Sequence, residues 1–237
     1  MIPDDAAERL LDSAQIIARE CEKLEISQWE VYATQGYGHS LDIEAGKISM
    51  ASGGGEGGFG IRIVEEGRYG FAHLVDPHSS SRAIKEALSI AKKSPSIEGF
   101  ELPGEQAAKK VGGMMDKSIL SMGPEDLLEQ GDQVLTRVTE LDSRAVAVGG
   151  GIGIGAGSGA LLTSTGIEDS GVYTSHGIGV HVSIDENDQL TSSYEGESSR
   201  TALKDLTASV DKAVHWAQIT RDKIKGGWTD FDKAVST

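Results

Sequence analysis

The sequence contains one internal repeat, and this repeat limits what the chain can fold into more than any other feature. Four short motifs of the amino-terminal half recur in the same order in the carboxy-terminal half, offset by 118 to 121 residues. They pair Pro3-Asp4-Asp5 with Pro124-Glu125-Asp126, Gly36-x-Gly38-x-x-Leu41 with Gly157-x-Gly159-x-x-Leu162, Gly58-Phe-Gly-Ile-Arg-Ile63 with Gly177-Ile-Gly-Val-His-Val182, and Ser80-Ser81-Arg82 with Ser198-Ser199-Arg200. Four colinear matches indicate that one structural unit occurs twice.

Each half of the sequence is patterned as a helix, a set of strands and a second helix. Apolar residues at helical spacing predict helices over residues 10–21, 84–91, 134–141 and 203–217. Between them, apolar residues on every second position predict strands around residues 59–63 and 178–184. The serine motifs at residues 80–82 and 198–200 are expected to open helices, where hydroxyl groups cap free amides.

These patterns predict an α+β fold made of two tandem α-β(n)-α repeats, with Gly-rich, mainly antiparallel strands covered by helices. The first repeat with its connector is expected at residues 1–121 and the second at residues 122–237, the two together forming one domain. Residues 94–123 are assigned to the connector because they carry Pro95, Pro103 and the Gly112-Gly113 pair with few apolar clusters.

The charge balance argues against one class of partner. The 237 residues include 37 acidic and 22 basic side chains, which gives a formal net charge of −15. A protein that binds nucleic acid phosphates needs Lys and Arg, so no nucleic-acid partner is expected. The first residues show no basic segment followed by an apolar run, so no secretory signal is visible and a cytoplasmic location is expected.

Residues 145–167 carry no charge, and Gly149, Gly153 and Gly157 have the GxxxG spacing of packed membrane helices. However, 8 of these 23 residues are Gly, which leaves little bulk to bury in lipid. Val146, Val148, Ile152 and Ile154 also fall on every second position, as in a strand. The sequence therefore predicts a glycine-rich strand here and no membrane partner.

Motifs of several enzyme classes are missing from the sequence. None of the 6 histidines is followed by Glu, so HExxH and its relatives are absent, as are GxSxG and the Walker A loop. The lone Cys21 falls on the apolar stripe of the first helix and is expected to be part of the core. No cofactor is expected in this chain.

Gly53, Gly55, Gly58 and Gly60 belong to a run that matches GxGxxG twice. A dinucleotide fingerprint needs a helix N-terminus directly after it, whereas the residues from Ile61 onward are patterned as a strand. The run is expected to be a flexible connector between strands. A loop that closes on a small molecule is the alternative.

His73, Asp76 and His78 stand between a predicted strand and the second helix. Two imidazoles and a carboxylate suit metal binding or proton transfer, but Pro77 breaks the strand between them. Turn and capping chemistry at Asp76 is the competing interpretation. His176 and His181 are an odd number of positions apart on a strand, so a metal pair is not favoured there.

Arg62 and His181 are equivalent positions of the two repeats. Each lies between two apolar residues of a strand, so each side chain points away from the predicted core. One interpretation is a solvated sheet face. The other is a polar face or groove that receives a peptide or a partner protein.

Two segments of the sequence, residues 58–72 and 162–166, resemble a known family. Gly58-Phe-Gly-Ile-Arg-Ile-Val, followed by Glu65-Glu-Gly-Arg-Tyr-Gly-Phe-Ala72, resembles the amino-terminal signature of the TldD/PmbA family, and Leu162-Thr-Ser-Thr-Gly166 resembles a later segment of it. The resemblance runs over nearly the whole chain. Its motifs are Gly and Arg positions in hairpins and do not form a catalytic signature.

The resemblance implies a part in peptide processing or degradation, within a family once called modulators of DNA gyrase. Its TldD branch is a zinc metallopeptidase whose HExxxH ligands lie in the carboxy-terminal half, and its PmbA branch lacks them and pairs with TldD. No position of this sequence matches that motif. Zinc is therefore expected only in a longer parent protein, and whether this chain is part of an enzyme stays open.

Two functions follow from the resemblance. The first is the amino-terminal domain of a TldD/PmbA-like peptidase system, which contributes a peptide-binding sheet surface and contacts in a homo- or hetero-oligomer. The alternative is a non-enzymatic, PmbA-like partner or regulatory module. The candidate substrate contacts are Arg62, His181, the four glycines Gly53, Gly55, Gly58 and Gly60, and the group of His73, Asp76 and His78.

Overall fold

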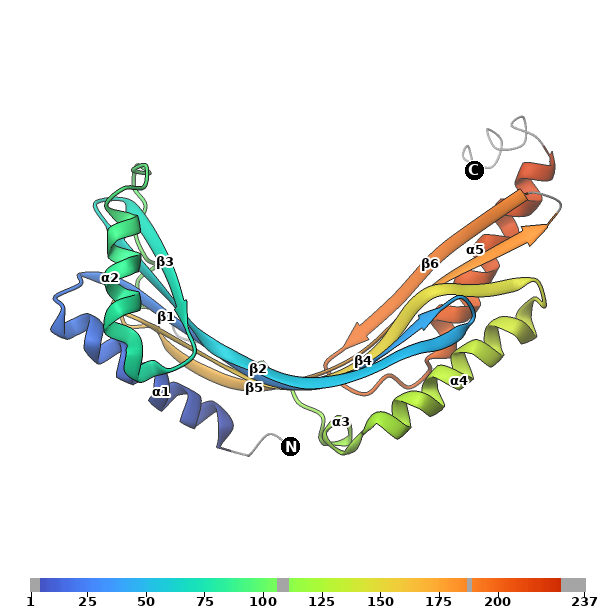
Figure 1. Cartoon of the computed structure of the whole chain (residues 1–237), viewed down its shortest axis with the longest axis horizontal. Helices are drawn as coiled ribbons and strands as arrows, with labels where there is room; N and C mark the ends of the chain where they lie inside the picture. Colours follow the sequence, from blue (N-terminus) through green and yellow to red (C-terminus); the bar gives the residue numbers. More distant parts are fainter. Residues whose placement is uncertain (1–4, 106–110, 187–188, 227–237) are drawn as a thin grey trace. The chain divides into compact units, whose positions relative to one another are not determined.

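The structure, a computed structural model, describes residues 5–105, 111–186 and 189–226, with side chains up to residue 220. The elements of the first half are α1 (Ala6–Lys23), β1 (Gln28–Glu44), β2 (Lys47–Glu65), β3 (Arg68–Leu74), the 3₁₀ turn η1 (Pro77–Ser79) and α2 (Ser80–Ala91). Those of the second half are α3 (Lys117–Ser121), α4 (Pro124–Leu141), β4 (Ala145–Thr163), β5 (Glu168–Glu186), β6 (Gln189–Ser199) and α5 (Thr207–Gly226). The order α-β-β-β-α occurs twice, which confirms the predicted α+β class with two tandem α-β(n)-α repeats (Figure 1).

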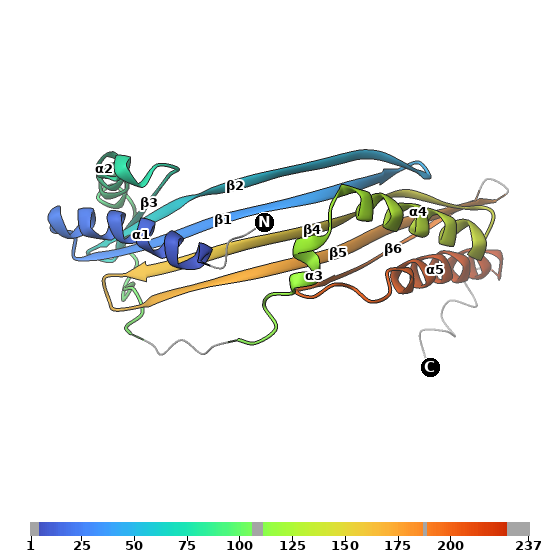
Figure 2. The same ribbon diagram turned by 90° about the horizontal axis from the view of Figure 1, so that it is seen from below.

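The strands form one six-stranded sheet in the order β3-β2-β1-β4-β5-β6 (Figure 2). β2 and β3 pair antiparallel, from Phe59 opposite Leu74 to Glu65 opposite Arg68. β5 and β6 pair in the same way, from His176 opposite Ser199 to Glu186 opposite Gln189. Each repeat therefore contributes three neighbouring strands, and β1 and β4 join the two repeats.

Two compact units divide the chain differently from the repeats. Unit 1 consists of residues 1–37, 55–115 and 156–173, and unit 2 of residues 38–54, 116–155 and 174–237. Strands β1, β2, β4 and β5 contribute residues to both units. The expected boundary after residue 121 separates sequence repeats and stays a prediction.

The core of unit 1 lies between one side of the sheet and helices α1 and α2. The residues that alternate inward on β1 and β2 are Trp29, Val31, Ala33, Phe59, Ile61 and Ile63. They meet the predicted apolar stripes of the helices: Leu10, Ala14, Ile17, Ala18 and Cys21 on α1, and Ala83, Ile84 and Ala87 on α2. Cys21 is fully buried, as expected, and its burial raises the pKa of the thiol to about 12.

The core of unit 2 is built in the same manner with helices α4 and α5. Ile178, Val180, Val182 and Ile184 of β5 are buried against Val134, Val138, Val210 and Val214 of the helices. Arg137 on α4 forms a two-pronged ion pair with Asp211 on α5, at 2.7 and 3.1 Å. The apolar core and this polar bridge fix the two helices on the sheet.

Strand β4 changes the face it buries. Ala147 and Ile152 both belong to the core of unit 2 although they are an odd number of positions apart. Between them, Gly150 has φ +141°, and a Cβ there would overlap the carbonyl of Gly179. One extra residue at this bulge shifts the alternation, so Val146 is exposed while Ile152 is buried. The predicted strand is correct, but its alternating residues do not share one face.

Residues 145–163 of the uncharged stretch thus lie in a strand, as expected. Within the described ranges, no helix has both the length and the apolar character needed to cross a membrane.

The prediction that residues 198–200 open a helix is wrong. Ser198 and Ser199 are the last residues of β6, paired with Gly177 and His176. α5 begins later, at Thr207, where the Asp205 carboxylate accepts hydrogen bonds from the Thr207 N–H and hydroxyl. Leu203 and Leu206, predicted to be in the fourth helix, precede α5 and still contact the core of unit 2.

The other helix starts agree in part with the sequence analysis. Ser80 is the first residue of α2 as predicted, but the hydroxyl of the preceding Ser79 donates to the Asp76 carbonyl and does not cap the helix. Pro124 opens α4, where the Asp126 carboxylate accepts from the Gly123 N–H at 2.7 Å. Pro3 and Asp4, the counterparts in the first repeat, lie outside the described residues.

Candidate functional site

Arg62 lies on the side of the sheet in unit 1 that faces away from α1 and α2. It alternates on β2 with the buried Ile61 and Ile63, and its guanidinium Nη1 lies 3.3 Å from Glu30 Oε1 on β1. On β1, β2 and β3, the side chains that alternate with core residues share this surface, which we call the open face of unit 1. Its residues are Glu30, Tyr32, Arg62, Phe71 and His73. Tyr32 and Phe71 expose 52% and 51% of their surface there.

His181 occupies the equivalent surface in unit 2. It alternates on β5 with the buried Val180 and Val182, and it lies directly opposite Tyr194 on β6. The open face of unit 2 consists of Gly179, His181, Ser183, Ser192 and Tyr194. Tyr194 is 65% exposed, the same kind of large aromatic surface as in unit 1.

Each open face carries an aromatic ring above a glycine of the neighbouring strand. A Cβ at Gly60 would lie 2.9 Å from Phe71 Cε2, and a Cβ at Gly179 would lie 3.2 Å from Tyr194 Cζ. Arg62 and His181 follow these glycines by two positions, directly opposite Phe71 and Tyr194 respectively. Both repeats therefore have the same arrangement: an aromatic ring covers a glycine of the next strand and lies opposite a basic side chain.

The predicted glycine run does not form a loop. Gly53, Gly55, Gly58 and Gly60 all belong to the continuous strand β2, so the expectation of a flexible connector is wrong. The backbones of β1 and β2 approach closely here, since a Cβ at Gly57 would lie 3.0 Å from the Thr34 carbonyl oxygen. Pairing with the long strand β1 keeps the run extended despite its composition.

A cavity of about 480 Å³ lies beside this run in unit 1. It is bordered by α1, by β1, by β2 and by the segment that leaves β3. Its lining residues are Arg9, Leu10, Ser13, Thr34, Gln35, Gly36, Gly55, Glu56, Gly57, Gly58, Phe59, Val75 and Pro77. Two of the candidate residues, Gly55 and Gly58, thus line one cavity.

His73, Asp76 and His78 are separated by the start of η1. His73 is the residue before the last one of β3 and lies on the open face, whereas Asp76 Oδ1 accepts a hydrogen bond from the His78 N–H at 3.0 Å. These contacts agree with the capping interpretation of Asp76. No cluster of three or more His, Cys, Asp or Glu side chains suited to a metal ion occurs in the part of the chain that the structure describes.

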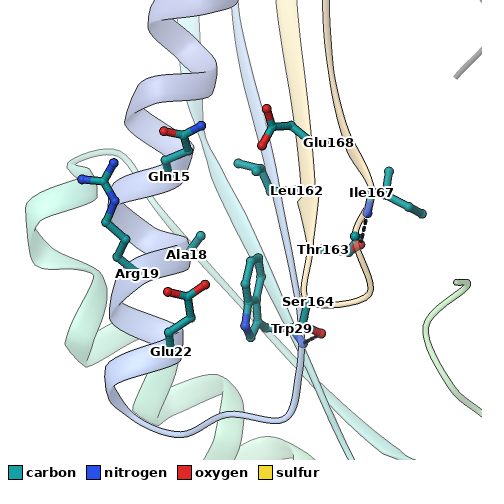
Figure 3. A pocket seen from close by; sticks show the side chains of 11 residues that line it. Gln15, Ala18, Arg19, Glu22, Trp29, Leu162, Thr163, Ser164, Ile167 and Glu168 are labelled. Carbon is teal, nitrogen blue, oxygen red and sulfur yellow. Dashed lines mark hydrogen bonds between the residues drawn. The ribbon is translucent and has the colours of Figure 1, made fainter. Parts of the chain in front are cut away.

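A second cavity of about 390 Å³ lies between α1 and the turn from β4 to β5 (Figure 3). Gln15, Arg19 and Glu22 of α1 are among its lining residues, and Trp29 and Leu162 form its apolar wall. The Ser164 hydroxyl accepts from the Trp29 N–H at 3.1 Å, and the Thr163 hydroxyl accepts from the Ile167 N–H at 3.0 Å. The Leu162–Gly166 motif therefore closes this turn and fixes it to β1.

The sequence analysis did not single out His176 as part of a polar network. His176 is 1% exposed; its Nδ1 accepts from the Leu203 N–H at 3.1 Å, so the ring proton is on Nε2, next to Gln130 Oε1 at 3.2 Å. Burial lowers the pKa of this imidazole. Its even spacing from Ile178 and Val180 was the signal that places it on the core face.

Asp116 joins three segments of unit 2 beside His176. Its carboxylate accepts from the N–H groups of Ser118 and Ala202, both at 2.9 Å, and its own N–H donates to the Thr174 hydroxyl. These hydrogen bonds lower the pKa of Asp116. The network ties the chain before α5 to α3 and has a structural role.

Comparison with known proteins finds a family that part of the chain resembles. Residues 29–93 match the family described as PmbA/TldA metallopeptidase domain 1. The matched segment thus resembles the first domain of the TldD/PmbA family. This segment includes the β2–β3 hairpin, where Glu66 and Gly67 form the turn with φ +52° and +72°, so the family resemblance inferred from that hairpin is confirmed.

The proteins that this chain is similar to are longer than it is. An uncharacterised protein of Methanocaldococcus jannaschii is 27% identical over 174 residues, which cover 72% of this chain and 37% of that protein. TldE from Thermococcus kodakarensis has a TM-score of 0.74 and 21% identity, covering 87% of this chain and 47% of its own. A Bacteroides thetaiotaomicron protein named as a proposed modulator of DNA gyrase has a TM-score of 0.76 and 20% identity, covering 92% and 50%. These structures show the shared fold, and this chain spans half or less of each relative.

The name of the matched family implies a metal, but the described residues do not fit one. His73 and His78 flank a carboxylate that caps η1, and no group of three donors converges elsewhere in the described ranges. We therefore derive no catalytic step through a metal from these residues.

Proposed function

We propose that this chain acts as a peptide-binding first domain of a TldD/PmbA-type peptidase system. The observation that carries the proposal is the arrangement shared by both open faces: Phe71 over Gly60 opposite Arg62, and Tyr194 over Gly179 opposite His181. The match of residues 29–93 to a domain named for a metallopeptidase supports a peptide as the class of ligand.

The chemistry of the open faces suits an extended peptide. Exposed aromatic rings on a rigid sheet supply contact area at little cost in conformational entropy. Arg62 adds a guanidinium, a group that donates hydrogen bonds to carbonyl and carboxylate oxygens. Its ion pair with Glu30 is partly exposed and therefore weak, so a peptide oxygen can compete with Glu30 for the guanidinium. In this proposal the main chain of the strands holds the side chains in place and the rings make the contacts.

The proposal assigns hydrolysis to residues beyond this sequence, because the chain has no HExxH-type motif. The domain would present peptides to a metal-bearing segment of a parent protein or to a TldD/PmbA-type subunit. Cleavage of a peptide only after such a subunit is added would agree with this division of labour.

Binding of a fluorescein-labelled, unfolded peptide, followed by anisotropy, tests the proposal. The double variants Arg62→Ala/Phe71→Ser and His181→Ala/Tyr194→Ser remove one open face each, and we expect each to weaken binding at least about fivefold. Arg82→Ala is the control, because Arg82 is an exposed residue on α2 that pairs with Glu86 away from either open face. Unchanged affinity in both double variants would contradict the proposal.

A further inference from the structure

The segment after α2 crosses the open face of unit 1 at one end. We call residues 96–103 the strap. Near its start, its main chain donates to the Gly67 carbonyl of the β2–β3 turn at 2.8 Å. In its middle, the Leu102 N–H donates to Gln28 Oε1 on β1 at 3.0 Å, and near its end its main chain accepts from the Thr165 hydroxyl of the β4–β5 turn at 2.6 Å. The strap is therefore fixed at three places across the width of the sheet.

The strap covers apolar residues on the side of the sheet that faces away from α1 and α2. Val64 follows Arg62 by two positions on β2 and so faces the same side, yet it is only 2% exposed. Tyr69 lies directly opposite Val64, and its ring centroid is 5.5 Å from that of Phe100 in the strap. Leu102 of the strap is buried as well. None of these residues belongs to either helix-covered core, so the strap has an apolar contact of its own with the sheet.

The strap ends beside the row of side chains that contains Arg62. Each residue beneath the strap lies two positions from a residue of the open face, and two positions on one side of a strand are about 7 Å apart. The pairs are Gln28 with Glu30, Val64 with Arg62, and Tyr69 with Phe71. The row of Glu30, Arg62 and Phe71 is thus the first that a ligand can reach next to the strap.

Arg62 provides hydrogen-bond donors in this row. Its ion pair with Glu30 consists of one Nη1 contact at 3.3 Å, and within the described residues it is the only ion pair that Arg62 makes. The Arg62 side chain is 42% exposed and that of Glu30 only 18%, so the guanidinium is more open to a ligand than the carboxylate beneath it. A planar guanidinium matches a carboxylate through two parallel hydrogen bonds.

The open face of unit 2 differs at the equivalent place. Ser183 and Ser192 occupy the positions that correspond to Val64 and Tyr69, and they lie directly opposite one another. Ser192 is exposed. Two small polar side chains give a strap no apolar surface to cover, so among the described residues the closed end is a feature of unit 1.

We propose that the row beside the strap binds the C-terminal end of a peptide. Arg62 receives the terminal carboxylate, the last side chain packs on the ring of Phe71, and the strap stops the chain from continuing along the face. This inference rests on the proposed function and names the part of the peptide that unit 1 selects. The recognised class is a peptide with a free C-terminus and an apolar last residue.

A peptide that ends in Leu and carries fluorescein at its N-terminus tests the carboxylate contact by anisotropy, as the free acid and as the C-terminal amide. The His181→Ala/Tyr194→Ser chain is used throughout, so that binding at the open face of unit 1 is measured. We expect the free acid to bind about tenfold more tightly than the amide. Arg62→Gln should bring this ratio close to one, whereas Arg82→Gln, which removes an exposed guanidinium on α2, should leave it unchanged.

The amide peptide with and without four further Ser residues tests the strap. With the strap intact, we expect the extension to weaken binding at least about threefold, because the added residues meet the strap. In Phe100→Ser/Leu102→Ser the two peptides should bind equally, whereas Ile97→Ser, at an exposed position of the strap, should keep the difference. Circular dichroism of each variant checks that it is folded.

Three outcomes would overturn the inference: equal binding of free acid and amide, a ratio that Arg62→Gln leaves unchanged, or an extension that does not weaken binding. If Arg62→Ala/Phe71→Ser nevertheless weakened the binding of every form of the peptide, the proposed function would stand without this inference. Absence of any peptide binding would overturn both proposals.

Discussion

The ring of Phe71 lies over the α-carbon of Gly60, on the strand beside it. A Cβ at Gly60 would be 2.9 Å from Phe71 Cε2, closer than two such carbons pack. The glycine and the ring therefore depend on one another, as do Gly179 and Tyr194 in the second repeat. Phe71 is 51% exposed, so the ring covers the glycine and remains accessible to a ligand.

This relationship predicts that the two positions are energetically coupled. Gly60→Ala in the otherwise unchanged chain pushes the ring aside, whereas in a Phe71→Ala background the same change gains about 0.5–1 kcal/mol from the lower backbone entropy of Ala. Urea denaturation of the four proteins of this double-mutant cycle measures the coupling. Additive effects of the two substitutions would show that the ring does not depend on the glycine.

Gly70 is predicted to be far more sensitive than a glycine with free space around it. A Cβ at Gly70 would overlap the carbonyl of Ala87 and lie 2.6 Å from the Ala91 amide nitrogen, so Gly70→Ala has to move α2 off β3. We expect a loss of about 3 kcal/mol or more in the free energy of unfolding. Gly171→Ala, at a position with nothing within 4 Å, is the control and is expected to change stability by less than about 1 kcal/mol.

His176 predicts a pH dependence of stability with a defined sign. Burial lowers the pKa of the folded imidazole below the unfolded value of about 6.5, so in this range the unfolded chain binds the extra proton. The stability that His176 contributes is therefore complete above about pH 6.5 and is lost as the pH falls through the lowered pKa. Denaturation of the chain and of His176→Gln is measured between pH 7.5 and about 5. The free energy of unfolding should fall more steeply with decreasing pH in the unchanged chain than in the variant. Parallel curves would contradict this role.

Asp142 is predicted to hold the end of α4 through Arg144 and α5. Its carboxylate accepts from Arg144 Nη2 at 2.7 Å, from Arg144 Nε at 2.9 Å and from Gln218 Nε2 at 3.0 Å, and the Arg144 guanidinium lowers the pKa of the carboxyl. Asp142→Asn is expected to cost about 1–3 kcal/mol at pH 7, less than in a fully buried pair because Arg144 is 38% exposed. Since the folded pKa is depressed, this difference shrinks as the pH falls below about 4.

The exposed ion pair of Arg82 and Glu86 is the matched control for Asp142. Glu86→Gln removes a pair of similar length, 2.9 Å, from the surface of α2. It is expected to change the free energy of unfolding by less than about 0.5 kcal/mol. Equal losses in the free energy of unfolding from Glu86→Gln and Asp142→Asn would show that burial does not strengthen the interactions of Asp142.

The sequence predicted the elements whose signal is local. The stripe of Leu10, Ala14, Ile17 and Cys21 defines α1 because helical periodicity depends only on near neighbours. The repeat predicted a set of strands between two helices in each half. The same reasoning predicted that Arg62 and His181 face away from the core.

The features that the sequence did not predict depend on distant partners. The glycine run at residues 53–60 is extended because β1 pairs with it, which composition alone does not reveal. Ser198 and Ser199 have the composition of a helix start but pair with β5, and the capping carboxylate is Asp205. The division into two compact units depends on strands long enough to contribute to both.

Amide chemical shifts of the ¹⁵N-labelled chain, titrated with an unfolded peptide, test the central claim most directly, because they report binding and its place together. The account predicts progressive shifts on the open faces at residues such as Phe71 and Tyr194, with the amides of α2 and α5 unaffected. Spectra that stay unchanged at millimolar peptide would contradict the claim that this domain binds extended peptides.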